Sequence, residues 1–281
     1  MPTDSERGKA FNEELLRIRR EYARLHKETP EQLKRIVEQA LAQIQDILRS
    51  APTDYQTWLL PQFEAQIKQI LENLSQQATS TTQNALAAAW ANGIATTDSP
   101  LLAAGISISA ALPVIDQRQL AAITHLATSK IQGISDKTKE QINTHLALVM
   151  LGVESYSDAI TVITTILEQE VRYVANRILR TELARANSIA GHLRKVQSAE
   201  YLPGLKKQWR RSGRKYPRET HTYADGQIRE LDEPFDIGDV HMQHPHDPSA
   251  PASEVINCGC LSLPYMDSWE VKYKGRRDIP S

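Results

Sequence analysis

Proline is distributed unevenly along the 281 residues, and this distribution limits which parts of the chain can be helical. Residues 201–281 hold 8 of the 14 prolines and 8 of the 16 aromatic residues in under a third of the chain. Proline interrupts helix interiors, whereas aromatic side chains favour strands. We therefore predict an α+β protein: a mostly helical N-terminal two-thirds, followed by a long helix packed on a small antiparallel β-rich module.

The first 200 residues repeat apolar side chains at intervals of three and four, which is typical of amphipathic helices. Thr29 followed by Pro30 predicts a helix start, because Thr caps helices and Pro fits the first helical position. The segment 96–100, which ends in a proline, predicts a break. The expected helices are residues 7–27, 30–50, 55–77, 83–92, 116–130, 135–151 and 158–196.

Gly152 is expected to end a helix, and we place a domain boundary there. Residues 1–152 contain no cluster of His, Cys or carboxylate side chains, so they are interpreted as a helical scaffold that packs on itself or binds a partner. Residues 153–281 are predicted to form the second domain, a long helix with the β-rich module.

The bulk composition narrows the classes of protein. A net charge of −1 gives no overall attraction to nucleic acid or to an anionic membrane. No apolar run reaches the roughly 18–20 residues of a membrane span, and the N-terminus lacks the apolar core of a secretion signal. Two cysteines cannot build a disulfide framework, which fits a reducing cytosol. These features predict a folded, soluble protein.

Two adjacent blocks of opposite charge lie in the C-terminal third. Residues 206–218 contain seven basic side chains and no acid, and residues 219–239 contain seven acids with only Arg229 as a base. Neighbouring antiparallel segments could neutralise each other. Alternatively, the basic block contacts DNA phosphates, with Trp209 and Tyr216 available for stacking. The candidate DNA-binding residues are Lys206, Lys207, Arg210, Arg211, Arg214 and Lys215.

The segment 255–263 reads as a strand that carries both cysteines. Cys258 and Cys260 would then share one face about 6.6–7 Å apart, which is awkward for a disulfide but workable for two thiolates on a zinc ion. The remaining ligands would be His221 and one of three histidines in the loop 241–248, with His244 chosen first. The alternative is a pair of buried thiols in the core, with the histidines at the surface.

Seven short motifs follow one another in a fixed order. They are Arg180-x-Glu182 on a helix, Lys207-x-Trp209, Arg218-x-x-His221, Asp225-Gly226, Pro234-Phe235, Asp247-Pro248 and Asn257-Cys258-x-Cys260. Over roughly residues 165–265 this order resembles the phage head morphogenesis family, the Mu F-like minor head proteins. One position departs from the pattern, because Gly259 stands where the family commonly has Arg between the cysteines.

The resemblance implies a minor capsid protein of a tailed phage or prophage, found in the virion head and in the host cytoplasm during assembly. Implied partners are the portal, other capsid or scaffold proteins and double-stranded DNA. The resemblance implies no catalytic residue. Its structural motif positions in this sequence are Arg180, Glu182, Trp209, Arg218, His221, Asp225 and Asn257. Arg180 and Glu182 would hold the helix to the β-rich region, although Glu182 taken alone could simply pair with Arg185.

An enzyme is the competing interpretation. His221, Cys258 and Cys260 could form the site of a metal-dependent hydrolase or nuclease, or a Cys–His nucleophile pair. No HExxH pattern supplies the general base that metalloproteases use. ADP-ribosyl transfer is a third interpretation of the Arg180–Glu182 region, but no Ser-x-Ser or Glu-x-Glu follows it downstream. We therefore predict that the protein is not an enzyme.

Overall fold

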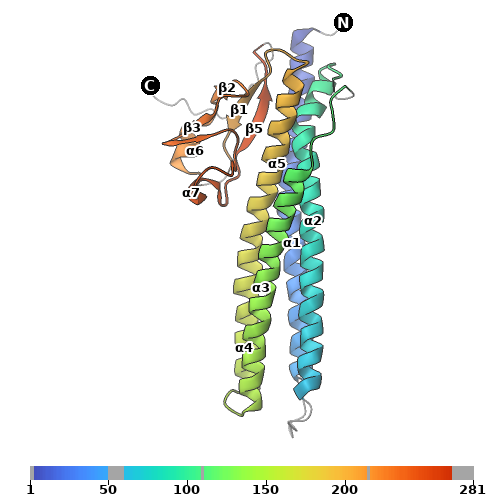
Figure 1. The fold of residues 1–281 in the computed structure, drawn as a ribbon, viewed down its shortest axis with the longest axis vertical. Coiled ribbons are helices and arrows are strands. Elements are labelled where there is room, and N and C mark those ends of the chain that lie inside the picture. Colours follow the sequence, from blue (N-terminus) through green and yellow to red (C-terminus); the bar gives the residue numbers. More distant parts are fainter. Residues whose placement is uncertain (1–2, 50–59, 109–110, 214–215, 268–281) are drawn as a thin grey trace. The chain divides into compact units, whose positions relative to one another are not determined.

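The computed structural model of the chain describes residues 3–49, 60–108, 111–213 and 216–267. The helices are α1 (Asp4–Arg49), α2 (Leu60–Ala103), α3 (Arg118–Met150), α4 (Tyr156–Ile166), the π-helix η2 (Leu167–Val174), α5 (Ala175–Ala199), α6 (Glu219–Tyr223) and α7 (Ala252–Val255). The strands are β1 (Lys206–Arg210), β2 (Ile228–Arg229), β3 (Phe235–Ile237), β4 (Val240–Met242) and β5 (Leu261–Tyr265). Long helices thus precede short antiparallel strands (Figure 1), and the predicted α+β class is confirmed.

The helices are longer and fewer than the sequence predicts. Pro30 lies inside α1 and Pro100 lies inside α2, so the predicted breaks at these prolines are wrong. Both prolines are buried, and their packing outweighs the lost backbone hydrogen bond. Residues 116–130 and 135–151 likewise belong largely to the single helix α3. The start of the helix predicted from residue 55 lies outside the described residues.

The chain packs into two compact units, and each unit combines segments that are distant in sequence. One unit contains residues Met1–His26, Leu86–Ala121 and Thr181–Ser281 in their described parts. The other contains Lys27–Ala85 and Ala122–Arg180. Each unit therefore draws on both sides of the boundary expected at residue 152. The long helices contribute different stretches to the two units.

The unit built from Lys27–Ala85 and Ala122–Arg180 is helical in its described part apart from the turn at residues 151–155. Its core consists of aliphatic side chains at intervals of three and four on four successive helical segments, and burying this apolar stripe is what stabilises the unit. The buried core residues include Val37, Ile44, Ile67, Leu71, Ile142, Leu146, Ile163 and Leu167. The predicted helix 158–196 is interrupted here, because residues Leu167–Val174 adopt π-helical hydrogen bonding.

In the other unit, α2 and α5 approach each other closely at two glycines. A Cβ added to Gly93 would lie 2.3 Å from the backbone oxygen of Asn187, and one added to Gly191 would lie 3.1 Å from the backbone oxygen of Gly93. Asn187 exploits this approach, because its Nδ2 donates to the Ala89 oxygen at 3.1 Å and to Asn92 Oδ1 at 2.9 Å. At this point α2 and α5 are therefore held together by close backbone contact and not by large side chains.

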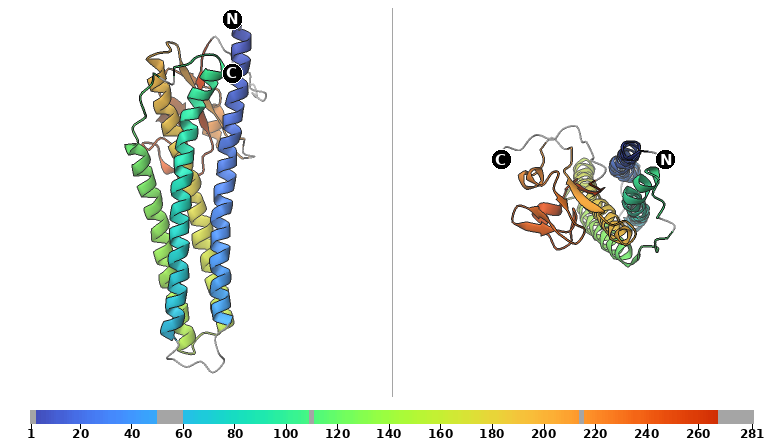
Figure 2. Two further views of the ribbon diagram at one scale, coloured as in Figure 1. Left: turned by 90° about the vertical axis from the view of Figure 1, so that its right-hand side faces the viewer. Right: turned by 90° about the horizontal axis from the view of Figure 1, so that it is seen from above.

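The same unit carries the β-rich module, whose strands gather beside α5 (Figures 1 and 2). A three-stranded antiparallel sheet has the order β2-β1-β5, with Trp209 opposite Ser262, and β3 and β4 form a separate hairpin. Leu263 of β5 packs with Phe11, Leu15 and Leu101 of the helices. The module is thus attached to α1 and α2 through its last strand.

We predict that Gly93→Ala lowers the free energy of unfolding by about 1–3 kcal/mol, because the new methyl group overlaps the Asn187 backbone. Urea denaturation followed by circular dichroism measures the change. Gly133→Ala is the control: Gly133 lies in α3 with no atom within 4 Å of an added Cβ, so the substitution should stabilise the helix by roughly 0.5–1 kcal/mol. Equal effects of the two substitutions would contradict this account of the helix contact.

Candidate metal centre

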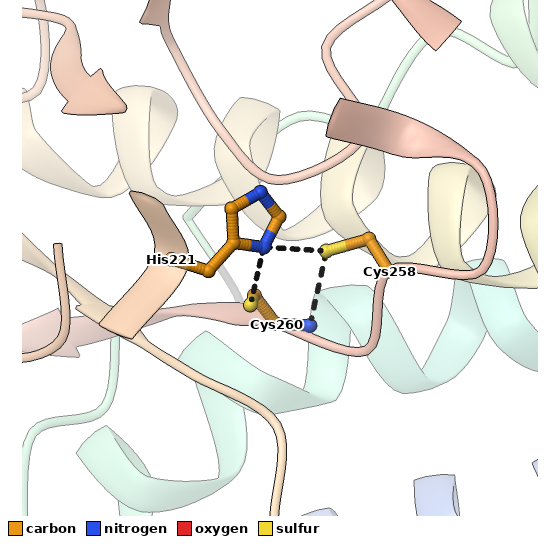
Figure 3. Close-up of side chains that lie close together, drawn as sticks. All are labelled: His221, Cys258 and Cys260. Carbon is orange, nitrogen blue, oxygen red and sulfur yellow. Dashed lines mark hydrogen bonds between the residues drawn. The ribbon is translucent and has the colours of Figure 1, made fainter. Parts of the chain in front are cut away.

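Three predicted ligands converge in the β-rich module. His221 lies on α6, and Cys258 and Cys260 lie in the loop between α7 and β5. His221 Nδ1 is 3.2 Å from Cys260 Sγ and 3.5 Å from Cys258 Sγ, and Figure 3 shows the ring directed between the two sulfurs. All three ligand atoms lie within 4.8 Å of one another, and all three side chains are buried.

The strand predicted over residues 255–263 is wrong in its first half. Residues Ala252–Val255 form the short helix α7, and Asn257 then adopts a left-handed conformation with φ of 55°. This turn ends the helix and places both cysteines before the strand, which begins at Leu261. The Cys260 N–H donates to Cys258 Sγ at 3.3 Å. The cysteines therefore meet through a tight turn and not through alternation along a strand.

The separations between these atoms fit a zinc ion. With Zn–S near 2.3 Å and Zn–N near 2.0–2.1 Å, two ligands of a tetrahedral ion lie about 3.6 Å apart if one is sulfur and the other nitrogen. The His221–sulfur distances of 3.2 and 3.5 Å are close to this value. The cluster could therefore bind a metal such as zinc.

Glu254 supports the histidine from the opposite side. His221 Nε2 lies 2.8 Å from Glu254 Oε2, which also accepts a hydrogen bond from Thr220 Oγ1 at 3.1 Å. A carboxylate on the outer nitrogen fixes the orientation of the ring and leaves Nδ1 as the nitrogen facing the sulfurs. Metal-binding histidines in proteins commonly have such a partner. Glu254 was not predicted, because nothing in its spacing distinguishes it from a surface acid.

The two thiols have opposite pKa shifts. A hydrogen bond from Cys260, with a further one from His221, lowers the pKa of Cys258. The hydrogen bond to Cys258, together with burial, raises the pKa of Cys260. These directions favour the thiolate form at Cys258 and the thiol form at Cys260. Thiolate is the form of cysteine that binds metals.

The structure does not bring His244 to the cysteines. Its Nδ1 lies 2.9 Å from the Pro245 backbone oxygen, and its ring centroid lies 5.2 Å from that of His192 with the two rings tilted by 46°. His241 is exposed and pairs with Asp236 at 2.9 Å. His244, the first choice for the fourth ligand, therefore lies outside the group of ligand atoms, and its ring contacts His192 of α5 instead.

Most of the predicted motif residues surround this centre. Trp209 is fully buried, with its ring 5.6 Å from His221 and 5.3 Å from Phe235. Arg218 Nη2 donates to the Ile256 oxygen at 2.7 Å and so braces the loop that carries the cysteines. Asp225 Oδ1 accepts a hydrogen bond from the Arg211 N–H at 3.1 Å. These residues position backbone and rings.

The three residues of the helical motif Arg180-x-Glu182 differ in burial and in their contacts. The Arg180 side chain is exposed, whereas Glu182 is buried and pairs with Arg185 at 2.5 Å. Thr181, the residue between them, contacts the cysteine loop, because its Oγ1 accepts a hydrogen bond from the Asn257 N–H at 3.4 Å. Thr181 was missed, since a threonine inside a helix gives no sequence signal of such a contact.

The basic block is largely neutralised by acids. Lys206 pairs with Glu230 and Asp267, and Arg210 and Arg211 both pair with Asp225. The prediction that Lys207 contacts DNA is wrong, because its side chain is fully buried. Its Nζ donates to the Leu231 oxygen, the Gln243 oxygen and Gln243 Oε1. Arg214 and Lys215 lie outside the described residues.

A cavity of about 460 Å³ lies beside the cysteine loop. The described residues that line it include three arginines and one histidine, and none of them is acidic. Cys258 and Gly259 form part of the cavity wall. The lining residues are Leu16, Arg19, Arg20, Tyr22, Ala23, His26, Arg211, Ser212, Gly213, Cys258, Gly259 and Leu261. The centre thus borders a basic surface contributed by α1 and by the segment that follows β1.

The fold and site define an α+β protein of helical units, one of which carries a β-rich module built around a histidine–cysteine centre. No protein family model and no solved structure matches the chain. Over 93 residues the chain is 39% identical to the uncharacterized protein YqbB of Bacillus subtilis, covering 31% of this chain and 29% of YqbB. Over 133 residues it is 28% identical to NAD(+)--arginine ADP-ribosyltransferase EFV of Enterococcus faecalis, covering 47% of this chain and 27% of EFV.

These similarities are partial, because the chain matches less than a third of the length of either curated relative. They show distant similarity to both proteins and assign no family. The resemblance to Mu F-like minor head proteins stays a prediction. Within the described ranges, no helix has an apolar stretch of the length needed to cross a bilayer.

Lys195 on α5 is a buried charge that the sequence analysis did not single out. Its Nζ donates to the Ser262 oxygen of β5 at 3.1 Å, and burial, with a smaller effect of Lys207, lowers its pKa to about 7 from the usual 10.5. Between these two values the unfolded chain binds more protons than the folded one. The free energy of unfolding therefore gains a contribution that increases with pH from about 7 upward.

We predict that Lys195→Met removes this contribution, which amounts to at most about 1.4 kcal/mol per pH unit for one proton. Urea denaturation at several pH values from 7 to 10 measures it as the difference between the slopes of wild type and variant. Lys206→Met is the matched control, because Lys206 is in a surface ion pair and its pKa is raised. Parallel slopes for wild type and Lys195→Met would refute the assignment.

Proposed function

We propose that this chain is a minor capsid protein that acts in head morphogenesis of a tailed phage or prophage. The observation that supports this most is the order of its motifs from Arg180 to Cys260, which resembles that of the Mu F-like minor head proteins. Trp209, Arg218 and His221 of this series contact one another or the cysteine loop, which is consistent with a motif order that encodes one structural module.

The site supports an architectural rather than a catalytic role. Cys258, Cys260 and His221 are 4%, 2% and 2% exposed. A catalytic zinc keeps an open position for water or substrate, whereas a structural zinc is enclosed by protein ligands. We infer that a metal held here would fasten α6 to the loop between α7 and β5, and that the protein performs no chemical turnover.

The proposed partners are the portal and other capsid or scaffold proteins. The chain would bind them in the host cytoplasm during assembly and remain in the virion head. Double-stranded DNA is a further proposed partner through the part of the basic block that stays at the surface. Lys206, Arg210 and Arg211 are paired with carboxylates in the structure. To bind DNA, they would have to exchange these carboxylates for phosphates. DNA contact is therefore expected to be weak and strongly dependent on salt.

The similarity to an ADP-ribosyltransferase does not by itself carry that activity to this chain, because just over a quarter of EFV is matched. A hydrolase or nuclease that uses His221, Cys258 and Cys260 is the alternative function. Both enzymatic alternatives predict turnover that is lost on substitution of His221 while the fold is retained. The structural proposal predicts loss of fold or assembly instead.

The proposal is tested by coexpressing the chain with the portal, scaffold and major capsid proteins of its own phage or prophage. We expect the chain in purified procapsids at fewer copies than the major capsid protein. His221→Ala should reduce its incorporation, with a stability loss on the order of 2 kcal/mol. Tyr223→Ala is the matched control on the same short helix, because Tyr223 is 63% exposed and should assemble normally.

Reproducible absence of the chain from procapsids, together with no binding to the portal, would contradict the proposed function. Nuclease, hydrolase or NAD-consuming activity that is abolished by His221→Ala in a folded protein would contradict the architectural role. All three activities can be measured on the same preparations of wild type and variant.

A further inference from the structure

His246 has no structural explanation within its own loop. Its side chain is fully buried, and among the described residues neither Nδ1 nor Nε2 reaches a hydrogen-bond partner at normal distance. Each buried polar atom left unpaired costs roughly 1–3 kcal/mol. Native proteins rarely keep such groups unless they serve an ion, an ordered water or a reaction.

The backbone at His246 is also unusual. Its φ is 61°, in the left-handed region that side chains other than Gly, Asn and Asp seldom adopt. In the described ranges, only His246 and Asn257 among non-glycine residues have positive φ, and Asn257 immediately precedes Cys258. Backbone strain of this kind persists at sites where the surrounding structure enforces a particular side-chain position.

Asp247 enforces the position of His246. Its Oδ2 accepts a hydrogen bond from the Gln243 N–H at 2.8 Å, and its Oδ1 accepts hydrogen bonds from the N–H and hydroxyl of Ser249 at 2.9 and 2.7 Å. One carboxylate thus closes the loop from both ends. Among the described residues, the loop provides no hydrogen-bond partner for the His246 imidazole that it encloses.

The loop that carries His246 packs in the same core as the cysteine centre. The loop is flanked by Met242, which belongs to the same buried core cluster as Cys258 and Cys260, and by Ala250, which packs against that cluster. His221, Cys258 and Cys260 provide three ligands, and a structural zinc site requires four. His246 is therefore a buried, unused nitrogen donor beside a centre that lacks one ligand.

We propose that His246 is the fourth ligand of a closed Cys₂His₂ zinc centre formed with His221, Cys258 and Cys260. In the structure the His246 ring lies outside the group of ligand atoms that are within 4.8 Å of one another, so closing the centre requires its nitrogen to come closer to them. The closed centre joins α6, the loop 243–249 and the loop between α7 and β5. This inference is independent of the proposed role in phage heads.

The test uses the full chain purified under reducing conditions, with metal content measured by mass spectrometry and with Co²⁺ exchanged into the site. Wild type should bind one ion per chain and show the intense visible bands of tetrahedral cobalt. His246→Asn is the diagnostic variant, because Asn tolerates the left-handed backbone. Its zinc affinity, measured against a competing chelator, should fall by more than the ~10–100-fold that loss of an outer partner causes.

His241→Asn and His244→Asn are the matched controls from the same region, and their zinc affinity and cobalt spectra should remain those of wild type. His246→Cys gives a positive readout, because a third thiolate should strengthen the sulfur-to-cobalt charge-transfer band. The proposal is overturned if His246→Asn keeps the wild-type affinity and spectrum, if His246→Cys leaves the spectrum unchanged, or if wild type takes up no zinc. No phage component enters these measurements, so failure here is distinguishable from failure of the proposed function.

Discussion

The meeting of one imidazole with two thiols is the constraint on which the β-rich module depends. Its strands are two to five residues long, and the core cluster around Trp209 and Phe235 counts both cysteines among its eight buried members. So small a core supplies little hydrophobic free energy, and small domains with such cores commonly add a disulfide or a metal. The turn at Asn257 and the carboxylate of Glu254 both serve to bring His221 to the sulfurs.

The sequence was informative where rare residues carried the argument. Cys258, Cys260 and His221 could be predicted as one cluster, because few residue types bind soft metals. The local geometry could not, since the alternation over residues 255–263 reads as a strand and only the left-handed Asn257 shows otherwise. Pro30 and Pro100 misled for a related reason: local rules predict a helix end, and burial in the finished fold outweighs them.

Charge was the other point at which sequence alone fell short. The basic and adjacent acidic blocks indicated two outcomes, mutual neutralisation or phosphate binding, and the ion pairs of Arg210 and Arg211 with Asp225 follow the first. Lys207 follows neither, because it is buried against carbonyl oxygens without a carboxylate. Single lysines of this kind cannot be distinguished from surface lysines by composition, since the acceptors come from segments 24 and 36 residues away.

The discontinuous makeup of the unit that carries the β-rich module has a consequence for biosynthesis. Phe11 and Leu15 share a buried cluster with Leu263, about 250 residues later in the chain. A ribosome adds about 5–20 residues per second, so Leu263 joins Phe11, Leu15 and Leu101 in this cluster only tens of seconds after the first helix is made. Until then, only the α2 residues Leu101 and Ala104 of the buried cluster are available to cover this face. Premature termination before β5 would leave a permanently incomplete core and a target for proteolysis.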